Sequence, residues 1–177
     1  MIIDMQMIMQ SRIDAGRDHV NHSAPDNIHD LAMTFRAKEW PIIHIRHSDD
    51  HPGSPLHPAA PGHPPMQCAH ALPGEPIFYK STSSAFASTN LDTYLRNEGI
   101  TELVVTGAVA GFCVNSTIRA GCDLGFKMIA IRDAILGFDL PLANLSASTI
   151  FDVTMAHLEA DFATVLTVSS FVSVNVT

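Results

Sequence analysis

Short apolar segments alternate with stretches of helical periodicity along most of this chain, and this alternation restricts its fold more than any other feature. Residues 103–105 are continuously apolar, as expected of a strand buried on both faces of a sheet. Strands that alternate with helices are typical of an α/β domain with a parallel sheet. Six strands are predicted, at residues 1–4, 41–45, 76–79, 102–106, 127–131 and 163–168, and helices are predicted from residue 25, from 91 to 99, from 113 to 124 and from 145 to 158.

A proline- and histidine-rich segment at about residues 47–75 interrupts the alternation. Residues 51–76 hold eight of the eleven prolines and four of the ten histidines. Proline at this density excludes a long helix or a central strand. A loop of this length in a compact domain is usually functional or mobile. Because the alternation resumes directly afterwards, we expect a single domain over residues 1–177.

Composition excludes several classes of protein. Hydrophobic residues make up 46% of the chain and charged residues 16%, which indicates a globular domain. The net charge of −8 argues against a nucleic-acid partner and against a polybasic membrane contact. No apolar run has the length of a membrane span, and an acidic residue at position 4 is unlike a signal peptide. Three cysteines without a tight pattern indicate reduced thiols, so we expect a cytoplasmic protein.

Three reactive side chains follow predicted strands. Asp4 closes the first strand, Lys80 closes the third, and Cys113 follows the fourth through a turn of small residues. Open parallel sheets bind ligands beyond the carboxyl ends of their strands, so the three groups should meet there. The start of a helix and a nearby Lys80 would both favour a thiolate at Cys113. Backbone N–H groups of residues 109–113 could form an oxyanion hole. Asp4 could accept the thiol proton and later donate it to a leaving amine.

Each of these residues also has an ordinary structural interpretation. A single cysteine is more often a small buried apolar residue than a nucleophile. An aspartate at the end of a strand is commonly a turn residue, and a lysine there is usually solvated. A non-catalytic function also stays open. In it the domain is a binding or thiol-sensing module, Cys113 is oxidised reversibly, and no substrate is turned over.

Three motifs resemble the isochorismatase-like cysteine hydrolase superfamily, the relatives of nicotinamidase and N-carbamoylsarcosine amidase. They are Ile-Ile-Asp-Met-Gln at residues 2–6, Glu-Pro-Ile-Phe-Tyr-Lys at 75–80 and Val-Thr-Gly-Ala-Val-Ala-Gly-Phe-Cys-Val at 105–114. Their order and spacing agree over nearly the whole chain. The resemblance implies a three-layer α/β/α, Rossmann-like fold whose six-stranded parallel sheet has the order 3-2-1-4-5-6.

The resemblance also implies a mechanism. The triad would be Asp4, Lys80 and Cys113, with a cis peptide bond between Ala108 and Val109. The backbone N–H groups of Val109 and Cys113 would form the oxyanion hole. The expected reaction is cleavage of a C–N bond in a small amide or carbamoyl compound through a thioester. An isochorismatase-type ether hydrolysis remains an alternative, and the superfamily implies a homodimer or larger homo-oligomer.

Two departures from the family pattern affect these expectations. Nicotinamidases bind a metal through an Asp-x-His pair on the second strand and a later histidine. Here the equivalent residues 44–47 are His-Ile-Arg-His, without the acid, and the histidines at 51, 57, 63 and 70 match no compact ligand spacing. We therefore expect neither a metal nor another cofactor. At position 110 an alanine replaces the threonine of many relatives, which removes a hydroxyl but leaves the backbone donors.

Four further residues are candidates for substrate binding: Gln6, His47, Phe86 and Phe112. Gln6 could orient the pocket or satisfy backbone groups. His47 could face the pocket mouth or lie on the plain surface. Aromatic side chains are more often core than pocket, but Phe86 and Phe112 adjoin the triad motifs.

Overall fold

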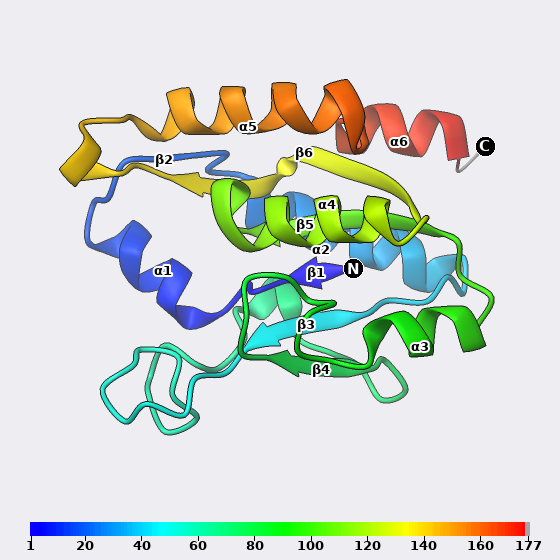
Figure 1. Cartoon of the computed structure of the whole chain (residues 1–177), viewed down its shortest axis with the longest axis horizontal. Helices are drawn as coiled ribbons and strands as arrows, with labels where there is room; N and C mark the ends of the chain where they lie inside the picture. Colours follow the sequence, from blue (N-terminus) through cyan, green and yellow to red (C-terminus); the bar gives the residue numbers. More distant parts are fainter. Residues whose placement is uncertain (176–177) are drawn as a thin grey trace.

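A computed structural model describes residues 1–175 as one seven-stranded, mostly parallel sheet between two layers of helices (Figure 1). The strand order is β2-β6-β5-β1-β3-β4, and β7 also pairs with β6. The predicted α/β/α class is therefore confirmed. The strands are β1 (Ile2–Ile3), β2 (His19–Val20), β3 (His44–His47), β4 (Ile77–Lys80), β5 (Glu102–Ala108), β6 (Lys127–Phe138) and β7 (Thr164–Leu166).

Six α-helices of the described residues cover the sheet. The helices form two layers: α3, α4 and α5 pack on one face of the sheet, and α1, α2 and α6 pack on the other. The buried apolar residues of each layer form a separate cluster. No helix in the described part of the chain is long and apolar enough to cross a membrane. The helices are α1 (Met7–Asp14), α2 (Ala24–Ala37), α3 (Leu91–Asn97), α4 (Asn115–Asp123), α5 (Ala147–Asp161) and α6 (Val168–Asn175), and shorter helical turns span Gln67–Ala69, Ala110–Val114 and Pro141–Ala143.

The sheet contains the six predicted strands in the predicted order, with one addition. Strand β2 pairs antiparallel with the end of β6, so the sheet has seven strands and is mixed. A two-residue strand is too short for a periodic pattern, which explains why it was not predicted. Helix α1 was also missed, because its apolar and polar residues do not separate into two faces and only Met9 is buried. Helix α6 was likewise not predicted.

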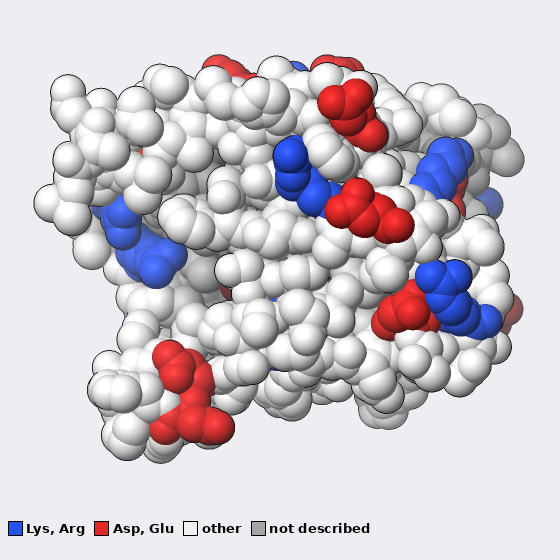
Figure 2. All heavy atoms as spheres, viewed as in Figure 1, with Lys and Arg blue, Asp and Glu red and all other residues white. Residues whose placement is uncertain are grey.

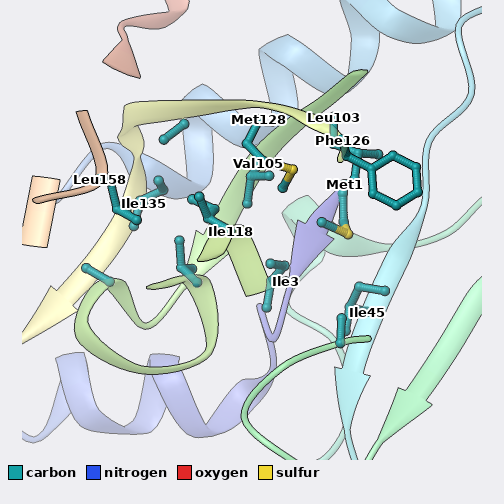
Figure 3. Close-up of a cluster of buried hydrophobic side chains, with 14 of the residues drawn as sticks. Met1, Ile3, Ile45, Leu103, Val105, Ile118, Phe126, Met128, Ile135 and Leu158 are labelled. Carbon is teal, nitrogen blue, oxygen red and sulfur yellow. The ribbon is translucent and has the colours of Figure 1, made fainter. Parts of the chain in front are cut away.

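The core explains the continuous apolar runs of the strands. Successive side chains point to opposite faces, so Ile3 packs with α3, α4 and α5, whereas its neighbour Ile2 packs with α2. Figure 3 shows the first of these clusters, in which Ile3, Ile45 and Val105 come from three adjacent strands. Both faces of the central strands are therefore buried, as the uninterrupted apolar runs predict.

A glycine lets two central strands end close together. Gly107 pairs with Ile3 and has φ +119°, a conformation that L side chains rarely adopt. A Cβ at this position would overlap the backbone oxygen of Ile3. The close approach brings the residue after β1 next to the turn that follows β5.

The proline-rich loop between β3 and β4 packs against the start of α1. Met7 N–H donates to Pro64 O at 2.8 Å, and Met66 N–H donates to Met5 O at 2.8 Å. Near the other end of the loop, Glu75 accepts from Arg36 Nε at 2.8 Å. The first two contacts place the middle of the loop beside the carboxyl end of β1, whereas Glu75 lies at the amino ends of β3 and β4.

Candidate active site

Lys80 is the centre of the site. It is the last residue of β4, pairs with His47 of β3, and is 1% exposed. Its Nζ lies 2.7 Å from Asp4 Oδ2 and 3.3 Å from Cys113 Sγ. It also lies 3.1 Å from His47 Nδ1 and 3.1 Å from Thr82 O. A buried ammonium is tolerated only when its donors are satisfied, and here four acceptors surround three N–H groups.

Asp4 presents one bound oxygen and one free oxygen. Its Oδ2 is paired with Lys80, whereas Oδ1 is buried and accepts no hydrogen bond within the described residues. The backbone of Asp4 has φ +48°, which is uncommon for a residue other than glycine. Strained backbone of this kind is concentrated at functional sites. Lys80 therefore fixes the carboxylate, and the other oxygen is available to accept a proton.

Cys113 is presented by an irregular turn. The Ala108–Val109 peptide bond is cis, and a turn of π-helix follows over Ala110–Val114. Within this turn Phe112 departs from helical geometry, with φ −123° and ψ −105°. Turns of π-helix are frequent at functional sites. The turn holds the half-buried Cys113 above the end of β5, within reach of Lys80.

The protonation state of Cys113 differs from the expected one. Burial, followed by the carboxylate of Asp4, raises the pKa of the Cys113 thiol to about 11, although Lys80 lowers it in part. We expected the helix start and Lys80 to favour a thiolate, but the cost of desolvating the anion and the adjacent negative charge outweigh them. A pKa of about 11 favours the thiol at neutral pH, so a base is needed to convert it to the thiolate.

Alkylation of Cys113 should therefore depend steeply on pH. With the pKa raised to about 11, the thiolate fraction increases as pH rises. The rate of carbamidomethylation by iodoacetamide should increase about tenfold per pH unit through pH 7–10. Peptide mapping by mass spectrometry separates Cys113 from Cys68 and Cys122. A rate that levels off below pH 8 would show instead that the thiolate is the resting form.

His47 and Gln6 lie next to this cluster. Burial, followed by the charge of Lys80, lowers the pKa of His47, so its Nδ1 accepts from the ammonium. Gln6 is fully buried, and its Oε1 accepts from His47 N at 2.8 Å. Its Nε2 donates to His47 O at 3.0 Å and to His63 O at 2.7 Å. Both amide hydrogens are used, so Gln6 satisfies backbone groups and ties β3 to the proline-rich loop.

The two phenylalanines lie in different surroundings. Phe86 does not wall the site: it stacks on Phe126 at 5.7 Å and packs into the apolar cluster beneath α4. The general preference of aromatic rings for the core accounts for this difference. Phe112 precedes Cys113 and is 49% exposed, so its ring lies on the surface beside Cys113.

One group of side chains in the described residues has the composition of a metal site. The ligand atoms of Asp4, His47 and Cys113 lie within 4.8 Å of one another. However, Lys80 Nζ lies within 3.3 Å of all three atoms. These groups therefore already surround a cation, the ammonium of the chain itself.

Two groups at this edge were not predicted from the sequence. One is the backbone carbonyl of Thr82, which no side-chain motif can reveal. The other is Arg12, a half-buried residue on α1. Arg12 follows the buried Met9 by three residues, which is helical spacing, but this signal is usable only once α1 itself is recognised.

Figure 2 shows a hollow in this face of the molecule, between the basic surface over α1 and the acidic surface of the loop after β3. The Rossmann-like strand order and a thiol held beside an acid and a lysine define the protein as an α/β/α domain with a cysteine-centred site at the carboxyl edge of its sheet. The chain belongs to the isochorismatase domain family, whose model matches residues 1–170.

Individual relatives agree with this membership. Isochorismatase family protein YrdC of Bacillus subtilis is 32% identical over 97% of this chain and 92% of its own length. The crystal structure of an isochorismatase-family protein from Chromobacterium violaceum superposes with a TM-score of 0.91, at 30% identity, over 97% of this chain and 90% of that one. N-carbamoylsarcosine amidase of Arthrobacter is 40% identical over 62 residues, which are 35% of this chain and 24% of that enzyme.

Proposed function

We propose that this protein hydrolyses a C–N bond in a small amide or carbamoyl compound, with Cys113 as the nucleophile. The observation that carries the proposal is the position of Lys80 Nζ, 2.7 Å from Asp4 Oδ2 and 3.3 Å from Cys113 Sγ. One buried lysine thus holds an acid and a thiol together at the carboxyl edge of the sheet. The similarity to an amidase of a carbamoyl compound supports the same class of substrate.

In the proposed reaction the thiol proton of Cys113 passes to Asp4 as the sulfur attacks the carbonyl carbon. The C–N bond then breaks, and this proton leaves with the nitrogen, so that a thioester and free amine or ammonia remain. Water attacks the thioester, Asp4 takes a proton from it, and the same proton returns to the sulfur as the acid is released. Lys80 stays protonated throughout and offsets the charge of the carboxylate.

The negative oxygen of the tetrahedral intermediate requires hydrogen-bond donors. We assign this role to the backbone N–H groups of Val109 and Cys113, at the two ends of the irregular turn. His47, which accepts from Lys80, and Phe112, which is exposed beside the nucleophile, are the side chains proposed to contact the substrate.

The raised pKa of Cys113 disfavours the alternative role of a thiol sensor. Redox-sensing cysteines are typically exposed thiolates of low pKa. Here burial raises the pKa of the Cys113 thiol to about 11. A thiol that must first lose its proton to Asp4 suits a nucleophile that is activated only when a substrate is bound.

Trapping of the acyl-enzyme tests this proposal. The protein is mixed with nicotinamide and with small N-carbamoyl compounds, quenched in acid, and analysed by intact mass and peptide mapping. We expect an acyl or carbamoyl adduct on Cys113 that decays as product forms. Turnover without an adduct, and at an undiminished rate in Cys113→Ser, would contradict the mechanism. Failure to turn over any member of the panel would contradict the substrate class.

Compartment and assembly are further parts of the proposal. All three cysteines are free thiols, which suits the reducing cytoplasm. We also propose a homodimer or larger homo-oligomer, supported by exposed large apolar side chains such as Leu142 and Val153. Light scattering after size-exclusion chromatography measures the assembly directly.

A further inference from the structure

Arg12 has no acidic partner among residues 1–175. Its guanidinium carbon lies 5.6 Å from the centre of the Phe138 ring. Within the described part of the chain its one polar contact is with the thioether sulfur of Met9, at 3.8 Å. A half-buried guanidinium with so few partners is unusual, because its five N–H groups lose water without gaining acceptors.

The acids on neighbouring segments are already engaged. Asp139 accepts from Arg17 Nε at 2.7 Å. Asp14 accepts from Gln10 Nε2 at 2.7 Å, and Asp18 accepts from Ala147 N at 2.9 Å. Residues 1–175 therefore supply a carboxylate to Arg17 but none to Arg12.

Arg12 lies close to the reacting groups. Phe138, over which it lies, follows by two residues Leu136 of β6, and Leu136 pairs with Ala108, the first residue of the cis peptide bond. Burial, followed by the charge of Arg17, lowers the pKa of Arg12, while a negative charge on Cys113 raises it. The guanidinium and the sulfur thus lie within each other's electrostatic field. Figure 2 shows basic surface over α1 at the border of the hollow.

We infer that Arg12 binds a carboxylate group of the substrate, so that the enzyme acts on amides or carbamoyl compounds that also carry a carboxylate. A guanidinium that lies over an aromatic ring keeps its N–H edge free, and that edge matches a carboxylate with two hydrogen bonds. The chain has a net charge of −8, so an anionic substrate needs such a local cation to offset the overall repulsion. This inference rests on the proposed function, since it takes Cys113 as the point of attack.

A pair of thiol reagents tests the inference without any known substrate. Iodoacetate and iodoacetamide react with Cys113 by the same chemistry, but only iodoacetate carries a carboxylate. Their rates at Cys113 are measured at pH 9 by peptide mapping in the native protein and in Arg12→Gln. We expect the ratio of the iodoacetate rate to the iodoacetamide rate to fall about tenfold in the variant, the effect of one charge-assisted hydrogen bond. The iodoacetamide rate should stay within about twofold, since that reagent is neutral.

Arg119→Gln is the matched control. Arg119 also lies over an aromatic ring, 3.8 Å from the centre of Phe162, and its removal changes the net charge equally. In Arg119→Gln the ratio of the iodoacetate rate to the iodoacetamide rate should equal that of the native protein. A ratio unchanged in Arg12→Gln, or lowered as much in Arg119→Gln, would overturn the inference. Equal loss of both rates in Arg12→Gln would also overturn it, because that result indicates a structural role.

A substrate pair separates this inference from the proposed function. N-carbamoylglycine and isobutylurea have nearly the same shape, but only the first has a carboxylate. We expect the preference for N-carbamoylglycine, as the ratio of kcat/KM values, to fall at least about tenfold in Arg12→Gln. Hydrolysis of both compounds with no preference would refute the role of Arg12 and leave the hydrolase intact. Hydrolysis of neither, with the reagent selectivity retained, would refute the proposed function and leave the carboxylate site.

Discussion

Replacing Cys113 with alanine is expected to lower kcat/KM for amide or carbamoyl hydrolysis by at least about a thousandfold, because no thioester can form. The substitution removes only a half-buried sulfur from an irregular turn, so the fold should persist. Far-ultraviolet circular dichroism and the midpoint of thermal unfolding check the fold, and initial rates with the same panel of amides check activity.

Two cysteines provide the controls for this experiment. Cys122, near the end of α4, and Cys68, in the proline-rich loop, are free thiols outside the site, so their alanine variants should retain activity within about twofold. Full activity of Cys113→Ala toward amides would refute the nucleophile. Consumption of isochorismate by the same variant would instead favour the ether-cleaving alternative, whose chemistry does not need the thiol.

Replacing Lys80 with methionine is expected to destabilise the protein by about 3–5 kcal/mol as well as abolish turnover. Methionine has a similar volume, so packing is largely kept. The substitution leaves Asp4, which is 2% exposed, without its 2.7 Å partner in the interior. Urea unfolding gives the loss of stability, and initial rates give the loss of activity.

A double variant distinguishes the charge effect from simple loss of packing. Asp4→Asn combined with Lys80→Met removes both charges, so it should recover most of the lost stability but none of the activity. Lys127→Met is the surface control, because Lys127 pairs with Glu102 while 68% exposed and should cost less than about 1 kcal/mol. If the double variant were no more stable than Lys80→Met, the buried pair would not be the cause.

Much of the fold was predictable because it depends on local pattern. Continuous apolar runs specify strands buried on two faces, and their alternation with helical spacing specifies a parallel sheet. Strand β2 was not predicted, because a strand of two residues has no periodicity. Helix α1 was not predicted, because Met9 is its only buried residue. Both are held by tertiary partners, such as the end of β6 for β2.

The site was predictable in part for the same reason. Asp4, Lys80 and the turn before Cys113 each follow a strand, and parallel strands deliver their ends to one edge. Which interpretation holds for Gln6 and Phe86, and where Arg12 lies, could not be predicted. Each depends on a partner far away in the sequence, such as His63 for Gln6 and Phe138 for Arg12.

By itself, the sequence determined the α/β class and placed three reactive side chains at the carboxyl ends of strands, since both follow from the alternation of strands and helices along the chain. Only the tertiary structure decided that Cys113 rests as a thiol with a pKa of about 11. The physical reason is that a pKa depends on burial and on the distances between charges, here those from the sulfur to Asp4 and Lys80. Asp4 lies 109 positions and Lys80 lies 33 positions from Cys113 in the chain. The fold sets the distances between them, and no spacing in the sequence records these distances.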